Sequence, residues 1–273
     1  MRTYLVQLSD LHIYDPARPA QDIIDTAACV RTAVALIGSL SETPHAVVIT
    51  GDLGDLGSDI EYERLAQLLQ PLRMPVYLLP GNHDNRAALR RCFPTHAYLQ
   101  QSTCDDFIQY DVQVGGLRLI ALDTVAPGQP YGELCERRLA WLEERLEHHR
   151  RASTPVVIAM HHPPFPTFIE HMDAMRLLRG ATELERLVSR YPNVERIICG
   201  HVHRSIERRF GGTLVQVAPS TAHQIALDFA PSARPHWNLE PAGFRLFALG
   251  EDGVLVSHLI PNGQYAGPYD FDS

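Results

Sequence analysis

Residue types that bind metal ions follow five short apolar runs of this 273-residue chain. Each run ends in an aspartate, an asparagine or a histidine. Carboxylate, amide and imidazole groups without a thiolate suit Mn, Fe, Co or Zn rather than a soft-metal site. The five segments are Ser9-Asp10-Leu11-His12, Gly51-Asp52, Gly81-Asn82-His83-Asp84, His161-His162-Pro163-Pro164 and Gly200-His201-Val202-His203.

Each of these segments, taken alone, has an ordinary structural explanation. Gly, Asn and Asp are common turn formers, and the Pro80-Gly81 pair indicates a turn by itself. Short motifs mislead easily. Turn chemistry alone does not readily explain the same placement at the ends of five runs, so we interpret the five segments as one site.

The number of donors predicts two metal ions. The expected donors exceed what a single tetrahedral ion accepts. Two ions about 3.5–4 Å apart and bridged by a carboxylate form the two-metal arrangement of phosphoesterases. Two divalent ions, two aspartates and one hydroxide leave a net charge of about +1, which would attract one phosphate group. Such ions can lower the pKa of bound water toward about 7 and supply hydroxide for in-line attack.

The apolar runs that precede these residues have the length and composition of buried strands. They are short, nearly continuous and rich in Val and Ile, as in strands covered on both faces. They are Tyr4–Leu8, Ala46–Ile49, Val76–Leu79, Val156–Met160 and Arg196–Cys199. Helical patterns lie between several of them, at Asp22–Leu40, Tyr62–Leu72, Arg138–His149 and Thr182–Arg190. This alternation predicts βαβ crossovers and mainly parallel sheets.

Other segments pair differently. Phe107–Val114 and Leu117–Thr124 are joined by Gly115-Gly116, a strong hairpin signal, and Phe244–Leu249 with Val254–Ile260 makes a second hairpin. We therefore expect an α/β fold, a four-layer αββα sandwich of two mixed β-sheets flanked by helices. Ligands bind outside the carboxyl ends of strands in open α/β sheets, so the five polar segments should converge on one crevice. If the strands continue, Asp10 and His12 point to the same face, as do His201 and His203.

The composition describes a globular chain and excludes several kinds of partner. Hydrophobic residues make up 45% and charged residues 21%, and the formal net charge of −8 argues against a stable nucleic-acid partner or a membrane partner. The beginning of the chain lacks the apolar length of a signal peptide. The cysteines are odd in number and have no CxxC pair, which fits free thiols in a reducing compartment and predicts a cytoplasmic protein. They are Cys29, Cys92, Cys104, Cys135 and Cys199.

The ordered set D-x-H, G-D, G-N-H-D, H-H-P-P and G-H-x-H resembles the calcineurin-like metallophosphoesterase superfamily. It is most similar to class III cyclic nucleotide phosphodiesterases and bacterial glycerophosphodiesterases. The motifs run from Asp10 to His203, and further likeness at Ser220–Gln224 and Tyr265–Pro268 extends over nearly the whole chain.

The resemblance implies a ligand set. One metal would be held by Asp10, His12 and His203 together with Asp52, which would bridge to a second metal held by Asn82, His161 and His201. The metals implied are two divalent ions per chain, from Mn²⁺, Fe²⁺ or Fe³⁺, Zn²⁺ and Co²⁺. His161 rather than His162 is taken as the ligand because the family pattern places the ligand two residues before a proline.

The remaining site residues receive catalytic or substrate-binding roles. The resemblance implies that His83 contacts the phosphate or assists the leaving group, and that Asp84 orients His83 by a hydrogen bond. Asn82 and Asp84 are therefore expected in the catalytic group beside His83. His162 becomes a pocket or substrate-binding residue, and His223 is expected to line the pocket.

The expected activity is that of a dinuclear phosphodiesterase acting on small phosphodiesters, such as cyclic nucleotides (cAMP among them) or glycerophosphodiesters. A phosphomonoesterase or nuclease of the same fold and a non-catalytic metal-binding protein remain the alternatives. Leu56 stands where protein phosphatases of the superfamily carry an arginine, which disfavours that activity. We assign residues 1–219 to a catalytic domain and 220–273 to a C-terminal extension with a β-hairpin, and the resemblance also favours a homo-oligomer.

Overall fold

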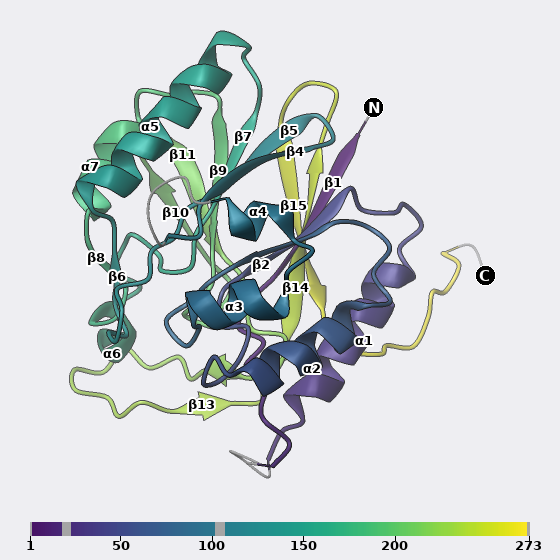
Figure 1. The fold of residues 1–273 in the computed structure, drawn as a ribbon. Coiled ribbons are helices and arrows are strands. Elements are labelled where there is room, and N and C mark those ends of the chain that lie inside the picture. The colour runs from purple at the N-terminus through teal and green to yellow at the C-terminus, as the bar shows by residue number, and fades with distance from the viewer. Residues whose placement is uncertain (1, 18–22, 102–106, 272–273) are drawn as a thin grey trace.

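The computed structural model describes residues 2–17, 23–101 and 107–271, which form two large β-sheets with helices on their outer sides (Figure 1). The first sheet contains β1 (Thr3–Leu8), β2 (Ala46–Thr50), β3 (Val76–Leu79), β14 (Gly243–Leu249) and β15 (Leu255–Pro261). The second contains β4 (Tyr110–Val114), β5 (Leu117–Ala121), β7 (Val156–Ala159), β9 (Val194–Cys199), β10 (Ile206–Phe210) and β11 (Thr213–Val217).

Shorter elements complete the described chain. Two small ribbons pair β6 (Gly132–Glu133) with β8 (Leu177–Arg179) and β12 (Gln224–Ile225) with β13 (Trp237–Asn238). The helices are α1 (Thr26–Gly38), α2 (Asp59–Leu69), α3 (Arg86–Cys92), α4 (Ala97–Gln100), α5 (Glu136–Arg151), α6 (Glu170–Asp173) and α7 (Ala181–Val188). Asp22, where the first expected helix began, lies outside the described residues.

Both large sheets are mixed, as predicted. The first has the order β15-β14-β1-β2-β3. In it β1, β2 and β3 are parallel to one another, and β14 is antiparallel to both of its neighbours, β1 and β15. The second has the order β10-β11-β9-β7-β5-β4, with a parallel centre and an antiparallel strand at each edge. The two predicted hairpins are confirmed as β4–β5 and β14–β15.

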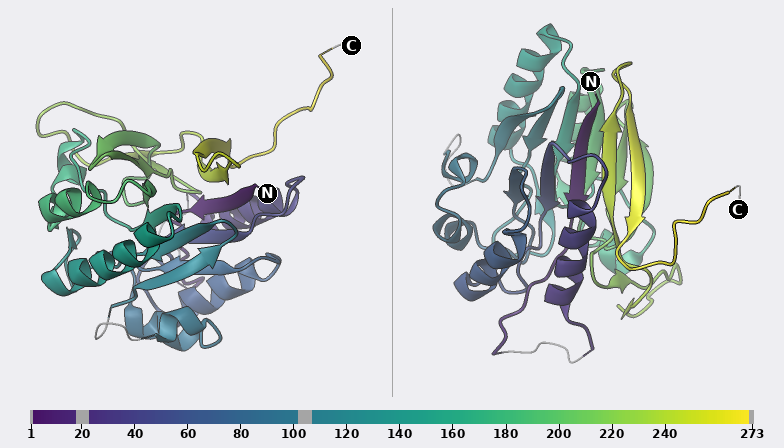
Figure 2. Two further views of the ribbon diagram at one scale, coloured as in Figure 1. Left: turned by 90° about the horizontal axis from the view of Figure 1, so that it is seen from above. Right: turned by 90° about the vertical axis from the view of Figure 1, so that its right-hand side faces the viewer.

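Alternate residues of the central strands belong to different cores, which shows that the sheets are covered on both faces. In β7, Val157 and Ala159 join the core that contains the first sheet, whereas Val156 and Ile158 join the core beneath α5 and α7. This alternation is the two-residue period of a strand. The result is the expected four-layer sandwich, with α1 and α2 outside one sheet and α5 and α7 outside the other (Figure 2).

The C-terminal hairpin is part of the first sheet. β14 pairs with β1 along its length, so that Leu5 lies opposite Phe247, and β15 forms the outer edge. The domain boundary at residue 219 stays a prediction, and the first sheet contains strands from both sides of it. Among the described residues, no helix combines the length and apolar composition of a membrane span. Four of the cysteines are free, and Cys104 lies outside the described residues.

Candidate metal centre

The predicted ligands lie in turns just beyond the strand ends. β1 ends at Leu8 and β9 at Cys199, so Asp10, His12, His201 and His203 are not in the strands. The expectation that each pair points to one face depended on continuing strands, and the strands end before these residues. The φ angles of these four residues lie between 42° and 73°, a left-handed conformation that a strand does not adopt.

Asp52 shares this conformation, with φ of 51°. Non-glycine residues in the left-handed region cost about 1–3 kcal/mol each and persist only where the surroundings hold them, which happens most often at functional sites. Backbone hydrogen bonds supply part of that hold. The amide of Asp10 donates to the carbonyl of Gly51 at 3.1 Å, and the amide of His12 donates to the carbonyl of Asp52 at 3.0 Å.

Two glycines of the motifs are required by close packing against the ligands. A Cβ added at Gly81 would collide with the carboxylate of Asp52. A Cβ added at Gly200 would collide with the hydroxyl of Ser9 and come close to the carboxylate of Asp10. The turn residues in G-N-H-D and G-H-x-H thus let the backbone approach the acidic side chains, in addition to bending the chain.

One group of donors gathers around Asp10 and His203. The ligand atoms of Asp10, His12, Asp52 and His203 all lie within 4.8 Å of one another. The Nε2 atoms of His12 and His203 face each other at 3.2 Å. Nε2 of His203 lies 3.5 Å from Oδ1 of Asp10, and Nε2 of His12 lies 3.7 Å from Oδ2 of Asp52. This is the first metal set implied by the resemblance.

A second group shares Asp52. Nε2 of His161 lies 3.3 Å from Oδ2 of Asp52 and 3.1 Å from Oδ1 of Asn82. Nε2 of His201 is buried and has no hydrogen-bond partner among the described residues. A buried nitrogen without a partner is rare and costly, and it points to a ligand at this place. His161, His201 and Asn82 thus gather where the second set was expected.

The opposite nitrogen of several imidazoles is held by a backbone or carboxylate oxygen. Nδ1 of His161 lies 2.7 Å from the carbonyl of Thr50, and Nδ1 of His203 lies 3.1 Å from the carbonyl of His223. Nδ1 of His12 lies 3.3 Å from a carboxylate oxygen of Asp55. Such contacts place the proton on Nδ1 and leave Nε2 as the metal-binding atom.

The electrostatics of the cluster favour cation binding. Burial raises the pKa of Asp10 to about 6. Burial opposes the charge on Asp52, but attraction to His161 outweighs it and holds the pKa of Asp52 well below its usual range. Burial alone would lower the pKa of His161, but the charge of Asp52 raises it to about 9. Burial lowers the pKa of His203 to about 3, so its imidazole is neutral and its lone pair is available.

The donor set therefore fits two metal ions. Two buried carboxylates, several imidazoles and an amide oxygen lie close together, and the buried Nε2 of His201 has no hydrogen-bond partner among the described residues. Oxygen and imidazole donors suit Mn, Fe, Co or Zn, and the geometry does not choose among them.

Asp84 has a different place from the one expected. Its carboxylate accepts hydrogen bonds from the backbone amides of Leu53, Gly54 and Gly81 and from the hydroxyl of Tyr62. The ring of His83 is held instead by the carbonyl of Asp55, 2.7 Å from Nδ1. We therefore revise the role of Asp84 from orienting His83 to clamping the Gly51-Asp52 turn onto the Gly81-Asn82 turn.

His162 also lies elsewhere than expected. It is fully buried, with Nδ1 2.8 Å from the hydroxyl of Thr124 and Nε2 3.3 Å from the carbonyl of Pro130. Its ring packs against those of His161 and His201. His162 does not line the cavity, and its ring nitrogens lie in one group with those of His161 and His201. Its substrate-binding role stays a prediction.

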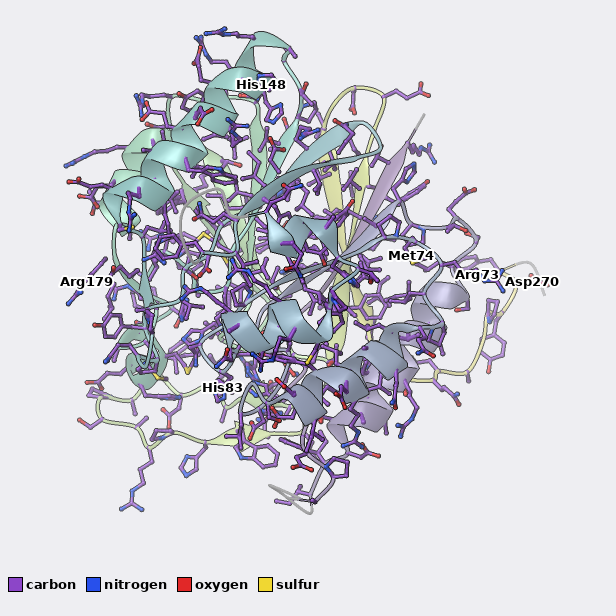
Figure 3. All side chains as sticks on the ribbon, viewed as in Figure 1. Arg73, Met74, His83, His148, Arg179 and Asp270 are labelled. Atoms are coloured by element: carbon purple, nitrogen blue, oxygen red, sulfur yellow. The ribbon has the colours of Figure 1, made fainter. Side chains whose placement is uncertain are left out.

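A cavity of about 300 Å³ opens over the cluster. His83 and His223 line it, as expected, and Figure 3 shows His83 below α3. Sequence reasoning missed Tyr14, Asp55, Pro130, Met172, Met175 and Ile225, which also line the cavity. Asp55 had a usable signal, since it stands three residues after Asp52 in the same turn; the others follow no motif.

Two charged residues near the cavity, Asp173 and Arg204, do not line it. The carboxylate of Asp173 accepts hydrogen bonds from Thr167 and Phe168 and so stabilises a local turn. Arg204 donates to the carbonyl of Ile225 and pairs with Glu240.

Known proteins resemble this chain over most of its length. The family model for calcineurin-like phosphoesterases matches residues 3–205. A probable glycerophosphodiester phosphodiesterase from Arcobacter nitrofigilis is 33% identical, over 98% of this chain and 96% of its own length. A probable cyclic nucleotide phosphodiesterase from Rhodopseudomonas palustris is 31% identical, over 96% of this chain and 93% of its own.

Solved structures share the fold at low sequence identity. A dimetal phosphatase from Danio rerio superimposes with a TM-score of 0.69 at 15% identity, covering 96% of this chain and 97% of its own. A purple acid phosphatase from yellow lupin gives a TM-score of 0.63 at 15% identity, covering 91% of this chain and 49% of its own.

Proposed function

The chain belongs to the calcineurin-like phosphoesterase family, and we propose that it hydrolyses small phosphodiesters with the help of two divalent metal ions. The observation that carries this proposal is a buried cluster of Asp and His donors beneath one cavity, in which Oδ2 of Asp52 lies 3.7 Å from Nε2 of His12 and 3.3 Å from Nε2 of His161. The two relatives named as phosphodiesterases match nearly the whole chain, which favours a diester over a monoester substrate.

We propose that Asp10, His12 and His203 hold one ion, that Asn82, His161 and His201 hold the other, and that Asp52 contributes to both. When bound, the ions would neutralise the phosphate and supply a nucleophile from water at neutral pH. The chain's part is to orient the imidazoles of His12, His161 and His203 through the contacts at Nδ1, and to keep the centre beneath a cavity.

His83 is the group best placed to handle a proton on the substrate. Its Nδ1 is fixed by the carbonyl of Asp55, and its ring stacks edge-on against that of His12 with centroids 4.8 Å apart. His83 is exposed and lines the cavity, so the protonated ring, with Nδ1–H on the carbonyl of Asp55, could donate its Nε2–H to the oxygen of the leaving alcohol.

His223 is proposed to contact the phosphate. It lines the cavity beside the metal cluster, with its ring 4.7 Å from that of His203. Burial lowers the pKa of His223 to about 3, so a neutral imidazole faces the substrate and contributes a single hydrogen bond rather than a charge. Its Nδ1 is buried without a hydrogen-bond partner among the described residues.

The wider setting of the protein also remains a proposal. We propose a cytoplasmic enzyme without a stable nucleic-acid partner, supported by the free thiols and the net charge of −8. We also propose a homo-oligomer, supported by the exposed Tyr265 and Tyr269 on a C-terminal segment that projects from the body (Figure 2). Light scattering of the purified chain measures the oligomeric state.

The test of the activity is hydrolysis by protein stripped of metal and reloaded with Mn²⁺. We expect metal-dependent turnover of bis(p-nitrophenyl) phosphate, with no turnover in the stripped protein. Comparison with a nucleoside monophosphate and single-stranded DNA separates a diesterase from a monoesterase or a nuclease. Bound metal without turnover of any ester would sink the proposal and favour a non-catalytic metal-binding protein.

A further inference from the structure

The cavity over the metal cluster has an apolar part that the metal-dependent reaction does not use. Met172, Met175 and Ile225 line it together with the polar residues. The polar residues Asp55 and His83 come from the turns that follow β2 and β3 of the first sheet. The apolar residues come instead from α6, from the residues just after it and from β12. Hydrolysis of the phosphate ester does not require an apolar surface, so we looked for a substrate group that this surface could bind.

This apolar part is a continuation of the protein core. Met172 is only 4% exposed and belongs to the core beneath α5 and α7, and Met175 and Ile225 pack against the same core. The carboxylate of Asp173 fixes the turn that starts α6, and the amide of Ser232 donates to the carboxylate of Glu170. The surface is therefore built into the fold and is present before a ligand binds.

The chemistry of these side chains selects the kind of group that they can bind. Methionine offers a polarizable thioether that contacts the edge or face of an aromatic ring, worth about 0.3–1.5 kcal/mol per contact. A polyol or an ammonium group placed against Met172, Met175 and Ile225 would lose water without gaining a hydrogen bond, which is unfavourable. The surface thus favours the face of a flat aromatic group.

We propose that Met172, Met175 and Ile225 bind the face of a flat aromatic group of the substrate, such as a nucleobase, and that Met175 is a specificity-determining residue. The proposal rests on the proposed function and narrows its substrate class. Nucleoside phosphodiesters are then preferred over diesters whose organic groups are only glycerol and a small amine. A volume of about 300 Å³ lies at the lower end of the range for small-ligand pockets and suits one nucleotide.

The first experiment compares two diesters on the Mn²⁺-loaded full chain and its Met175→Gln variant. Gln has nearly the length of Met but presents an amide. For cAMP we expect KM to rise about tenfold, with kcat changing less, since a lost apolar contact is worth about 10-fold or more. The rise in KM should be at least fivefold larger for cAMP than for glycerophosphoethanolamine. Met175→Leu, which keeps an apolar side chain, should restore KM for cAMP to within about twofold.

A matched control separates this effect from general damage. Met74 is also partly buried and packs on the other core, and Figure 3 shows it well away from His83. Met74→Gln should leave both KM values as in the original protein. Equal losses on the two diesters in Met175→Gln, or a wild-type preference for glycerophosphoethanolamine, would overturn the inference while leaving the proposed function intact.

The second experiment measures binding and does not depend on turnover. Titration calorimetry with AMP and with glycerol 3-phosphate reports the affinity of the two kinds of product. We expect Met175→Gln to weaken AMP several-fold more than glycerol 3-phosphate. A protein that turns over no diester but shows this difference would refute the proposed function and keep the apolar subsite. The same weakening for both products would refute the subsite.

Discussion

The cavity is built from two regions that reach the same place by different physical means. The polar region consists of turns that follow the central strands, in which Asp10, His12, Asp52, His201 and His203 all have positive φ. The apolar region consists of Met172, Met175 and Ile225, which have ordinary backbone angles and pack onto the core. One region is thus held by hydrogen bonds and strained backbone, the other by apolar packing.

This difference indicates which part of the site tolerates substitutions. Hydrogen bonds and metal contacts depend steeply on distance and angle, so an atom must stay where it is. Dispersion contacts are individually weak and non-directional, so another apolar side chain of similar volume replaces most of them. We therefore expect large, all-or-none effects in the polar region and small, graded effects in the apolar region.

The largest effect is expected for Asp52→Asn. This change keeps the size of the side chain but removes the one carboxylate common to both donor groups. We expect kcat/KM for bis(p-nitrophenyl) phosphate to fall by at least about 10³-fold, about 4 kcal/mol, because metal ions supply several kcal/mol of transition-state stabilisation. Metal content measured by plasma mass spectrometry should fall from about two ions per chain together with the activity.

Asp25→Asn is the matched control for that prediction. Asp25 caps the start of α1 by accepting from the amide of Ala28, and Asn caps a helix equally well. The control removes one carboxylate while keeping the cap, so metal content and rate should not change. Full metal content in Asp52→Asn would show that Asp52 does not join the two groups.

A smaller effect is expected for His83→Ala. Since His83 touches the backbone at Asp55 and faces the cavity, its loss should lower kcat by about 10²-fold, the lower end of the range for a general acid. Metal content should stay the same, which separates His83 from the metal-holding residues. His148→Ala, an exposed histidine on α5 far from the site in Figure 3, should change neither quantity. Loss of metal in His83→Ala would place His83 among the ligands.

Asp84→Ala tests the revised role of Asp84, which is to hold two turns of the site together. The change leaves three backbone amides and the Tyr62 hydroxyl without an acceptor, and unpaired buried donors cost about 1–3 kcal/mol each. Allowing for water that replaces some of these bonds, we expect a loss of about 3 kcal/mol and a fall in Tm of about 6–12 °C in the metal-free protein. Scanning calorimetry measures it.

Asp84→Asn sharpens the same prediction. The amide keeps one acceptor oxygen, so the fall in Tm should be clearly smaller than in Asp84→Ala. His83→Ala should not shift Tm because that side chain is exposed. If Asp84→Ala kept its Tm and lost rate as His83→Ala does, the earlier expectation that Asp84 orients His83 would be restored.

The polar region could be predicted from the sequence because its residues form short, recognisable motifs. Asp, Asn and His placed at the ends of Val- and Ile-rich runs are visible in a few letters, and parallel topology then brings distant turns together. The expected strands and both hairpins are present, and the boundaries shift by a residue or a few. The sandwich follows from the same patterns, because strands buried on both faces require cover on each side.

The sequence did not predict which neighbour of each motif does what. Asp84 and His162 stand beside a site residue in the chain, yet their side chains point to the backbone of another turn and to Thr124. The direction of each side chain depends on backbone angles that a short motif does not specify. Met175 and Ile225 were missed for another reason: an apolar residue in a connecting segment looks the same whether it faces a core or a cavity.

The smallest effect is expected in the apolar region, for Ile225→Val. The change removes one methylene from a partly buried side chain that lines the cavity. A fully buried methylene contributes about 0.8 kcal/mol. Because Ile225 is only partly buried, we expect a loss of about 0.4 kcal/mol in binding free energy, which corresponds to about a twofold rise in KM for cAMP. Steady-state kinetics resolve such a change when the variants are measured side by side. An equally conservative change in the polar region, Asp52→Asn, costs orders of magnitude, and this ratio expresses the difference between the two regions. If Ile225→Val lowered activity as far as His83→Ala does, the apolar region would be as exacting as the polar one, and packing alone would not explain its role.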